Sequence, residues 1–139
     1  MAGTAIPWSS ASADPMTAQW APQIADLVAG DDLAIGACCY IDSAGLVQLC
    51  DATAADVKGS FHGCPGRTVL TGQPVTLFGP GTRFLYDSAA GLTKGAQLFL
   101  DVLGTGSLID TAQTGDSTGV AVALNTTDIM ITNYKLIGG

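Results

Sequence analysis

Short apolar runs separated by polar, glycine-containing turns make up most of the chain. One run extends from Ala37 to Ile41, is followed by Asp42 and Gly45, and gives way to a second run that ends at Cys50. Two apolar runs joined by a turn with Asp and Gly are typical of strand, turn and strand. The pattern therefore predicts a β-hairpin in this stretch.

The same pattern recurs 59 positions further along the chain. Residues 33–53 align without a gap with residues 92–112, with seven identities in 21 positions. The identical pairs are Leu33 and Leu92, Gly36 and Gly95, Ala37 and Ala96, Asp42 and Asp101, Gly45 and Gly104, Leu49 and Leu108, and Asp51 and Asp110. Repetition at a fixed spacing indicates a duplicated supersecondary unit. We therefore expect two related strand-turn-strand units.

Further short apolar runs occupy residues 73–78, 82–87, 118–124 and 128–132, and Gly, Pro or polar residues bound them. A parallel α/β sheet would need helices of about a dozen residues between its strands, and the pattern predicts none here. Short strands at this spacing favour a sandwich or barrel. The expected fold is mainly β, a small β-barrel or β-sandwich built from the two related units.

The N-terminal stretch differs from the rest, because it holds both tryptophans and three of the six prolines. Proline removes a backbone donor and cannot pair inside a sheet, so residues 1–30 are predicted to form an extended arm on a domain spanning 31–139. One short helix is possible from Asp14 to Val28, with Ile24 and Leu27 on its apolar side.

Composition supports the β assignment and suggests contact with another protein. The chain contains no Glu, has 12 Asp and 18 Gly, and is 47% hydrophobic but only 12% charged. Asp and Gly favour turns, whereas the helix-favouring charged residues are scarce. With so few polar groups, part of the apolar surface is expected to be covered by another protein chain.

Charge and hydropathy argue against two classes of partner. The net charge is −7, and the five cationic side chains are scattered along the sequence at Lys58, Arg67, Arg83, Lys94 and Lys135. Such a chain repels phosphate backbones, so no nucleic acid partner is expected. No apolar run approaches the roughly 20 residues that span a bilayer, and the N-terminus lacks a secretory pattern. We expect a soluble protein made in the cytosol.

Catalytic and metal chemistry would have to use the single histidine and the four cysteines. His62 and Cys64 stand two positions apart and would share one face of a strand, yet nothing marks a third group to orient them. Zinc-ligand spacings are missing. The cysteines, Cys38, Cys39, Cys50 and Cys64, are expected to be reduced and buried, with the vicinal pair on opposite strand faces.

Turn sequences offer no cofactor site either. Asp42 and Asp101 open loops without the alternating acidic ligands of a calcium site. The stretch from Gly79 to Gly81 lacks the Lys-Ser/Thr and the helix of a phosphate-binding loop. No G-x-S-x-G nucleophile motif occurs. We therefore expect a non-enzymatic protein without cofactor or metal.

The duplicated unit G-A-x-x-[YF]-[IL]-D-x-x-G-x-x-x-L, from Gly36 to Leu49 and from Gly95 to Leu108, is followed by a small-residue strand at 119–124. Together these motifs resemble the head-decoration, or capsid cement, proteins of tailed bacteriophages. The resemblance implies a β protein on the outer surface of the virion, commonly a homotrimer. It would be made in the host cytoplasm, bind the major capsid protein and staple neighbouring capsid subunits.

The long arm departs from this family pattern. Its apolar side chains are predicted to contact the capsid, a neighbouring decoration subunit or the barrel of the same chain. These side chains are Ile6, Pro7, Trp8, Met16 and Trp20. Two other hypotheses remain open. The chain could be a β-barrel module of a tail or surface fibre that binds carbohydrate or a receptor in a groove lined by Tyr40, Tyr86, Tyr134 and the two tryptophans. It could also be a thiol enzyme using Cys64 and His62.

Overall fold

The computed structural model describes residues 23–137, which fold into two five-stranded sheets. The strands are β1 (Gln23–Ala29), β2 (Cys39–Ile41), β3 (Leu46–Leu49), β4 (Cys64–Pro65), β5 (Pro74–Phe78), β6 (Arg83–Leu85), β7 (Gln97–Leu100), β8 (Leu108–Ile109), β9 (Ala121–Ala123) and β10 (Asp128–Ile131). One 3₁₀ turn, η1 (Val57–Gly59), is the helical element of these residues. The fold is mainly β and sandwich-like, as the sequence predicts, and neither sheet closes into a barrel.

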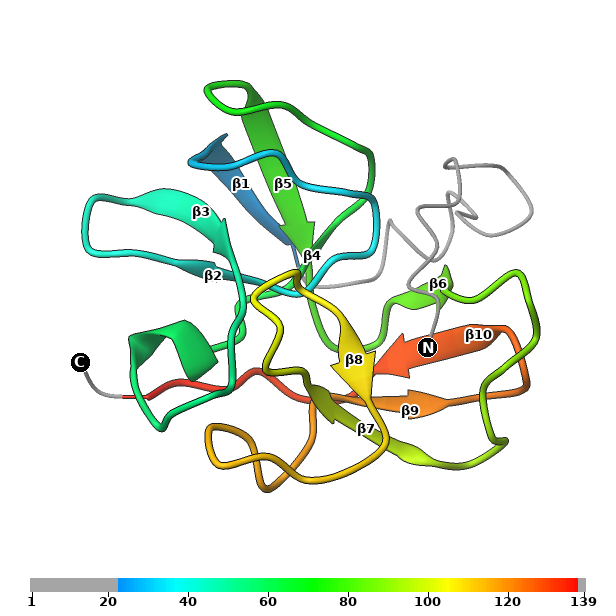
Figure 1. Cartoon of the computed structure of the whole chain (residues 1–139). Helices are drawn as coiled ribbons and strands as arrows, with labels where there is room; N and C mark the ends of the chain where they lie inside the picture. The colour runs from blue at the N-terminus through cyan, green and yellow to red at the C-terminus, as the bar shows by residue number, and fades with distance from the viewer. Residues whose placement is uncertain (1–22, 138–139) are drawn as a thin grey trace.

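The duplication extends well beyond the hairpins and covers both sheets. The first sheet has the order β2-β3-β1-β5-β4 and the second the order β6-β10-β9-β7-β8. Strands β1 to β5 and β6 to β10 follow one another in the same chain order, and three pairings recur: β1–β5 as β6–β10, β4–β5 as β9–β10, and β2–β3 as β7–β8. In Figure 1 the first group lies in the upper part of the molecule and the second in the lower part. The protein thus consists of two halves with related topology.

The two repeated hairpins agree in their first strand and differ in their second. The turns before β2 and β7 both place glycine in the left-handed region, with φ of 77° at Gly36 and 76° at Gly95. The N–H of Asp42 then bonds to the carbonyl of Leu46, whereas the N–H of Asp101 bonds to that of Ser107. The second loop is therefore two residues longer than the gapless alignment implies. Because side chains alternate between the two faces of a strand, a register shift of two residues leaves the same face of the second strand directed toward the core.

The predicted helix over Asp14–Val28 is wrong where the structure describes it, because residues 23–29 form β1. Ile24 lies opposite Leu77 and Leu27 opposite Val75, so two residues of β1 oppose one of β5 between these pairs. This bulge, with Asp26 at a φ of 64°, turns residues three apart to the same side. The spacing that favoured a helix is the signature of a bulged strand, and residues assigned to the arm belong to the sheet.

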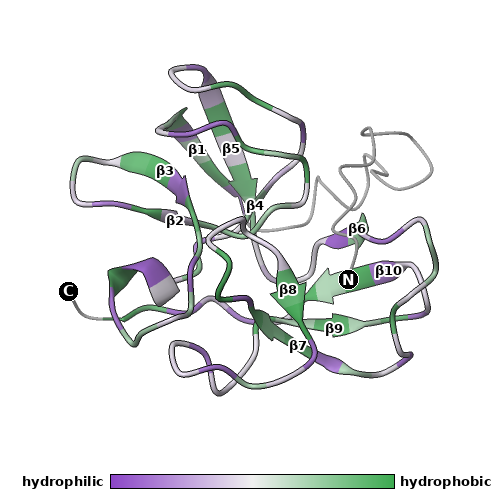
Figure 2. Ribbon diagram, viewed as in Figure 1, coloured by the Kyte–Doolittle hydropathy of each residue, from purple (hydrophilic) through white to green (hydrophobic). Residues whose placement is uncertain are grey.

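Buried side chains form two cores. The smaller core lies within the first half and contains Ala29, Leu33, Ala37, Cys39, Val47, Val69, Val75 and Leu77. The larger core joins the second half to residues of the first, and its fully buried side chains include Phe61, Leu100, Val120, Ile129 and Ile131. Figure 2 shows hydrophobic residues concentrated on the strands and hydrophilic residues in many of the turns.

Strand β2 separates the two cores. Cys39 and Ile41 face the smaller core, whereas Cys38 and Tyr40 face the larger one. Successive strand residues point to opposite sides, so a strand with apolar groups on both faces must be covered twice. The two halves therefore share a strand layer and cannot pack separately.

Backbone hydrogen bonds also join the halves. The N–H of Cys38 donates to the carbonyl of Gly106 over 2.7 Å, and the N–H of Ala52 donates to that of Asp101 over 2.9 Å. After β10 the chain returns to the first half, where Lys135 and Phe61 exchange both backbone hydrogen bonds. The Lys135 ammonium lies 3.5 Å from the fully buried carboxylate of Asp116. The final segment thereby fastens one half to the other.

Candidate functional site

His62 and Cys64 do not form a catalytic pair. The His62 Nδ1 accepts a hydrogen bond from the backbone N–H of Ile41 over 3.1 Å, which orients the ring toward β2. Burial lowers the pKa of His62, so the neutral form that accepts this bond is favoured. The Cys64 thiol is buried in the larger core, and burial raises its pKa well above the usual value. A protonated, inaccessible thiol is not a nucleophile.

All four cysteines are buried free thiols, as the sequence predicts. Cys38 and Cys39 lie in different cores, which confirms that the vicinal pair occupies opposite strand faces. The Cys50 thiol donates to the carbonyl of Ser60 over 3.0 Å, and burial raises the pKa of Cys50 well above the usual value. Among residues 23–137, no group of three or more His, Cys, Asp or Glu side chains is placed to hold a metal ion.

The loop aspartates hold turns. Asp42 Oδ1 accepts from the N–H groups of Ala44 and Leu46, and its Oδ2 accepts from Gln48 Nε2, each over 2.9 Å. The Gln48 hydrogen bond, followed by that from Leu46, lowers the pKa of Asp42. Asp101, its counterpart in the second hairpin, accepts from the N–H of Val102 over 2.6 Å. These carboxylates are used within their own loops.

The three tyrosines do not line a common groove. Tyr40 and Tyr86 are buried in the larger core, whereas Tyr134 is 40% exposed. The Tyr86 hydroxyl accepts a hydrogen bond from the N–H of Leu108 over 2.9 Å. Of the aromatic residues predicted to line that groove, Tyr40 and Tyr86 are therefore packed inside, and Trp8 and Trp20 lie outside the described residues.

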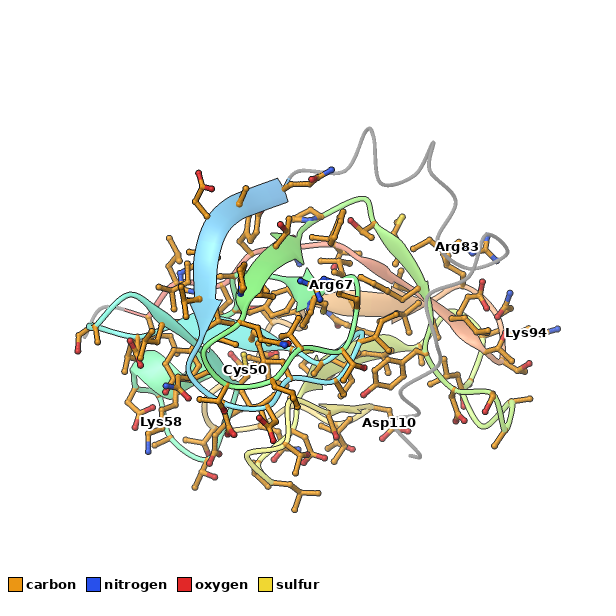
Figure 3. All side chains as sticks on the ribbon, turned by 90° about the horizontal axis from the view of Figure 1, so that it is seen from above. Cys50, Lys58, Arg67, Arg83, Lys94 and Asp110 are labelled. Carbon is orange, nitrogen blue, oxygen red and sulfur yellow. The ribbon has the colours of Figure 1, made fainter. Side chains whose placement is uncertain are left out.

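The cationic side chains are as dispersed in space as in sequence. In Figure 3, Lys58 lies at one end of the molecule, Arg83 and Lys94 lie at the other, and Arg67 lies between them. Arg83 is paired with Asp128 at 2.7 Å. Within the described part of the chain no basic patch forms that would follow a nucleic acid backbone. No helix of residues 23–137 is long and apolar enough to cross a membrane.

Exposed apolar side chains lie mainly in the connections between strands. Leu70 precedes β5, Leu103 stands in the β7–β8 loop, Leu124 follows β9 and Leu136 lies in the final segment. Leu103 and Leu136 are 70% and 75% exposed. Large apolar side chains at loop tips are candidate contacts with another protein. Sequence reasoning did not single them out, although leucine in a Gly-rich turn was a usable signal.

A cavity of about 490 Å³ borders the bulge of β1. Its walls are formed by Ala25 and Asp26 of β1, by Val75, Thr76 and Phe78 of β5, and by Arg67. The sequence pattern does not predict this cavity, because the bulge and the pairing of β1 with β5 create it. The arm residues predicted as contacts, Ile6, Pro7, Trp8, Met16 and Trp20, lie outside the described residues.

No protein-family model matches the chain, and the search of curated proteins finds no similar sequence.

Proposed function

We propose that this chain is a virion structural protein that binds the outer surface of a bacteriophage capsid. In this role a homotrimer of the chain would contact neighbouring major capsid subunits and stabilise the head. The proposal begins from the resemblance of the duplicated hairpin unit to capsid decoration proteins. The β-rich fold with two related halves is compatible with that family.

A structural role is supported most directly by the fact that the candidate reactive side chains are engaged in holding the fold together. His62 bonds to the backbone of β2, Cys64 is buried with a raised pKa, and Asp42 holds its own turn. Among residues 23–137, the side chains considered for catalysis thus contribute to the fold, either by hydrogen bonds to the backbone or by burial in the core. Exposed leucines at loop tips, in contrast, are suited to contact with another protein.

Sparse charge also fits a permanent assembly. Exposed apolar side chains from several loops would be covered by a coat subunit or a second copy, and the net charge of −7 would keep decorated particles apart. Many copies with interfaces of ordinary size would stabilise a shell by summing modest binding energies.

The decisive experiment mixes the full-length protein with empty heads of its phage and measures cosedimentation. We expect binding that saturates at a fixed ratio to the coat subunit. A Trp8→Ser variant tests the arm, and Leu103→Ser tests the exposed β7–β8 loop, with Leu70→Ser as a matched change on a different loop. Absence of cosedimentation, or binding without a fixed stoichiometry, would contradict the proposal.

A further inference from the structure

The cavity beside β1 has the shape and chemistry of a site for a flat aromatic side chain. Phe78 forms one wall, and its ring lies against the backbone of Gly66, where an added Cβ would stand 2.6 Å from the Phe78 Cε1. Only a residue without a side chain allows the ring to lie there. Val75 and Pro74 supply further apolar wall. The cavity is thus lined mainly by aromatic and aliphatic surface.

Two charged groups stand at this apolar site. Arg67 belongs to the wall, and its Nη2 donates to the carbonyl of Pro74 over 3.1 Å, which holds the guanidinium beside the start of β5. Asp26 contributes an exposed carboxylate from the β1 bulge. A guanidinium stacks well on an aromatic face, and a carboxylate accepts a hydrogen bond from an indole N–H. Together they match an indole better than an aliphatic side chain.

We propose that this cavity binds the indole of Trp20 from the same chain. Gln23, the first residue of β1, lies opposite Phe78 in the sheet, so the chain enters the described fold next to the cavity wall. Trp20 is three residues earlier, within roughly 10 Å of Gln23 even when extended. So short a tether gives an effective concentration on the order of millimolar, which favours the intramolecular contact.

The volume permits this occupant. A cavity of about 490 Å³ has room for one indole together with displaced solvent at its open side. Trp20 would rest on Phe78, its ring would stack with Arg67, and its N–H would donate to Asp26. Docking would fix the base of the arm, at Trp20, to β1 and β5. The inference concerns the isolated subunit and does not depend on capsid binding.

Tryptophan fluorescence tests the proposal directly, because Trp8 and Trp20 are the only tryptophans and both precede residue 23. In a Trp8→Phe variant of the full chain, Trp20 is the sole reporter. We expect its emission maximum at shorter wavelength than that of N-acetyltryptophanamide, and acrylamide quenching several-fold weaker. In the matched Trp20→Phe variant, Trp8 should be quenched nearly as readily as the free compound. Solvent-like emission from Trp20 would overturn the proposal.

Two further changes in the Trp8→Phe background locate the site. Thr76→Phe fills the cavity from a half-buried position on β5, and Arg67→Ala removes the stacking cation. Both should shift Trp20 emission to longer wavelength and raise quenching. The controls are Val122→Phe, at a half-buried position on β9, and Arg83→Ala, on the exposed Arg83–Asp128 pair. Equal effects of test and control variants would contradict the assignment.

The same measurement separates other occupants of the cavity. Docking within one chain predicts an emission maximum that does not change on dilution. A shift toward solvent-like emission as the protein is diluted would mean that the indole comes from a second copy, and would overturn the intramolecular form. Should Thr76→Phe disturb folding, as judged by its urea transition, Arg67→Ala with its Arg83→Ala control still decides the outcome.

Discussion

The two halves of the molecule share three strand pairings and differ at two junctions. In the second half β7 pairs with β9, whereas in the first half Cys39 of β2 meets Gly63, just before β4, in an isolated bridge. In the first half, β1 lies parallel to β3 and pairs with it through Val28 and Ala29. In the second half the corresponding strands, β6 and β8, are the two edges of the sheet. Tyr86, just after β6, instead accepts the N–H of Leu108 on β8 with its hydroxyl. A side chain thus replaces a strand pairing.

Strand length explains this difference. β1 has seven residues and continues past its bulge to pair with β3 at Val28 and Ala29, whereas β6 has three residues and ends at Leu85. The first half therefore encloses a core of its own, while the second shares its core with the first. The hairpin is similar in both halves. The length of the first strand, β1 or β6, determines whether the half encloses a core of its own.

The largest expected effect comes from Leu77 on β5 and Ile129 on β10, which are both fully buried. Each pairs with residues on both neighbouring strands, Leu77 with Ile24 and Pro65, and Ile129 with Phe84 and Ala123. Leu77→Ala and Ile129→Ala should each lower the free energy of unfolding by about 2–5 kcal/mol, because a cavity remains. Because β2 belongs to both cores, each variant should unfold in one urea transition, followed by far-UV circular dichroism. A separate early transition for Leu77→Ala would show that the halves unfold independently.

A smaller effect is expected where the Tyr86 hydroxyl stands in place of the β1–β3 pairing. Tyr86→Phe leaves the buried N–H of Leu108 without its acceptor, which should cost about 1–3 kcal/mol. The matched Tyr134→Phe change, at a more exposed residue, should alter the midpoint of urea denaturation much less. If both variants unfold at the same urea concentration, the Tyr86 hydroxyl does not serve as the substitute for the β1–β3 pairing.

The smallest expected effect is the difference in stability between matched substitutions in the two hairpin turns. Asp42→Asn removes the charged acceptor of Gln48 and should cost about 1 kcal/mol or less, since the turn is partly exposed. Asp101→Asn should cost less, because Asp101 accepts from one neighbouring N–H. Urea midpoints of the two variants provide the comparison, and a larger loss for Asp101→Asn would contradict it.

The Asp42 contribution should also depend on pH. Its hydrogen bonds lower the pKa of Asp42 in the folded protein below that of the unfolded chain. The stabilisation is therefore fully present above the unfolded pKa of about 4 and is lost as pH falls through the lower, folded value. The difference in urea midpoint between the native protein and Asp42→Asn should shrink below about pH 4. If the difference in urea midpoint stays constant to low pH, the Asp42 stabilisation does not depend on the charge of its carboxylate.

The amino-acid sequence by itself determined the β class, the two hairpins with their glycine turns, and the burial of the cysteines. These features depend on local alternation and on the positive φ that glycine permits, so neighbouring residues specify them. Cys38, Cys39 and Cys50 are a clear case, because they stand in the apolar runs of the first hairpin.

Only the tertiary structure determined the features that depend on contacts between residues far apart in the chain. The apolar spacing of Ile24 and Leu27 fits a helix or a bulged strand equally well, and pairing with β5 selected the strand. The cavity at Phe78 and Arg67, the Tyr86 junction and the two-residue register shift also arise from segments far apart in the chain. Local sequence cannot specify such contacts, since their energy exists only once both partners are in place.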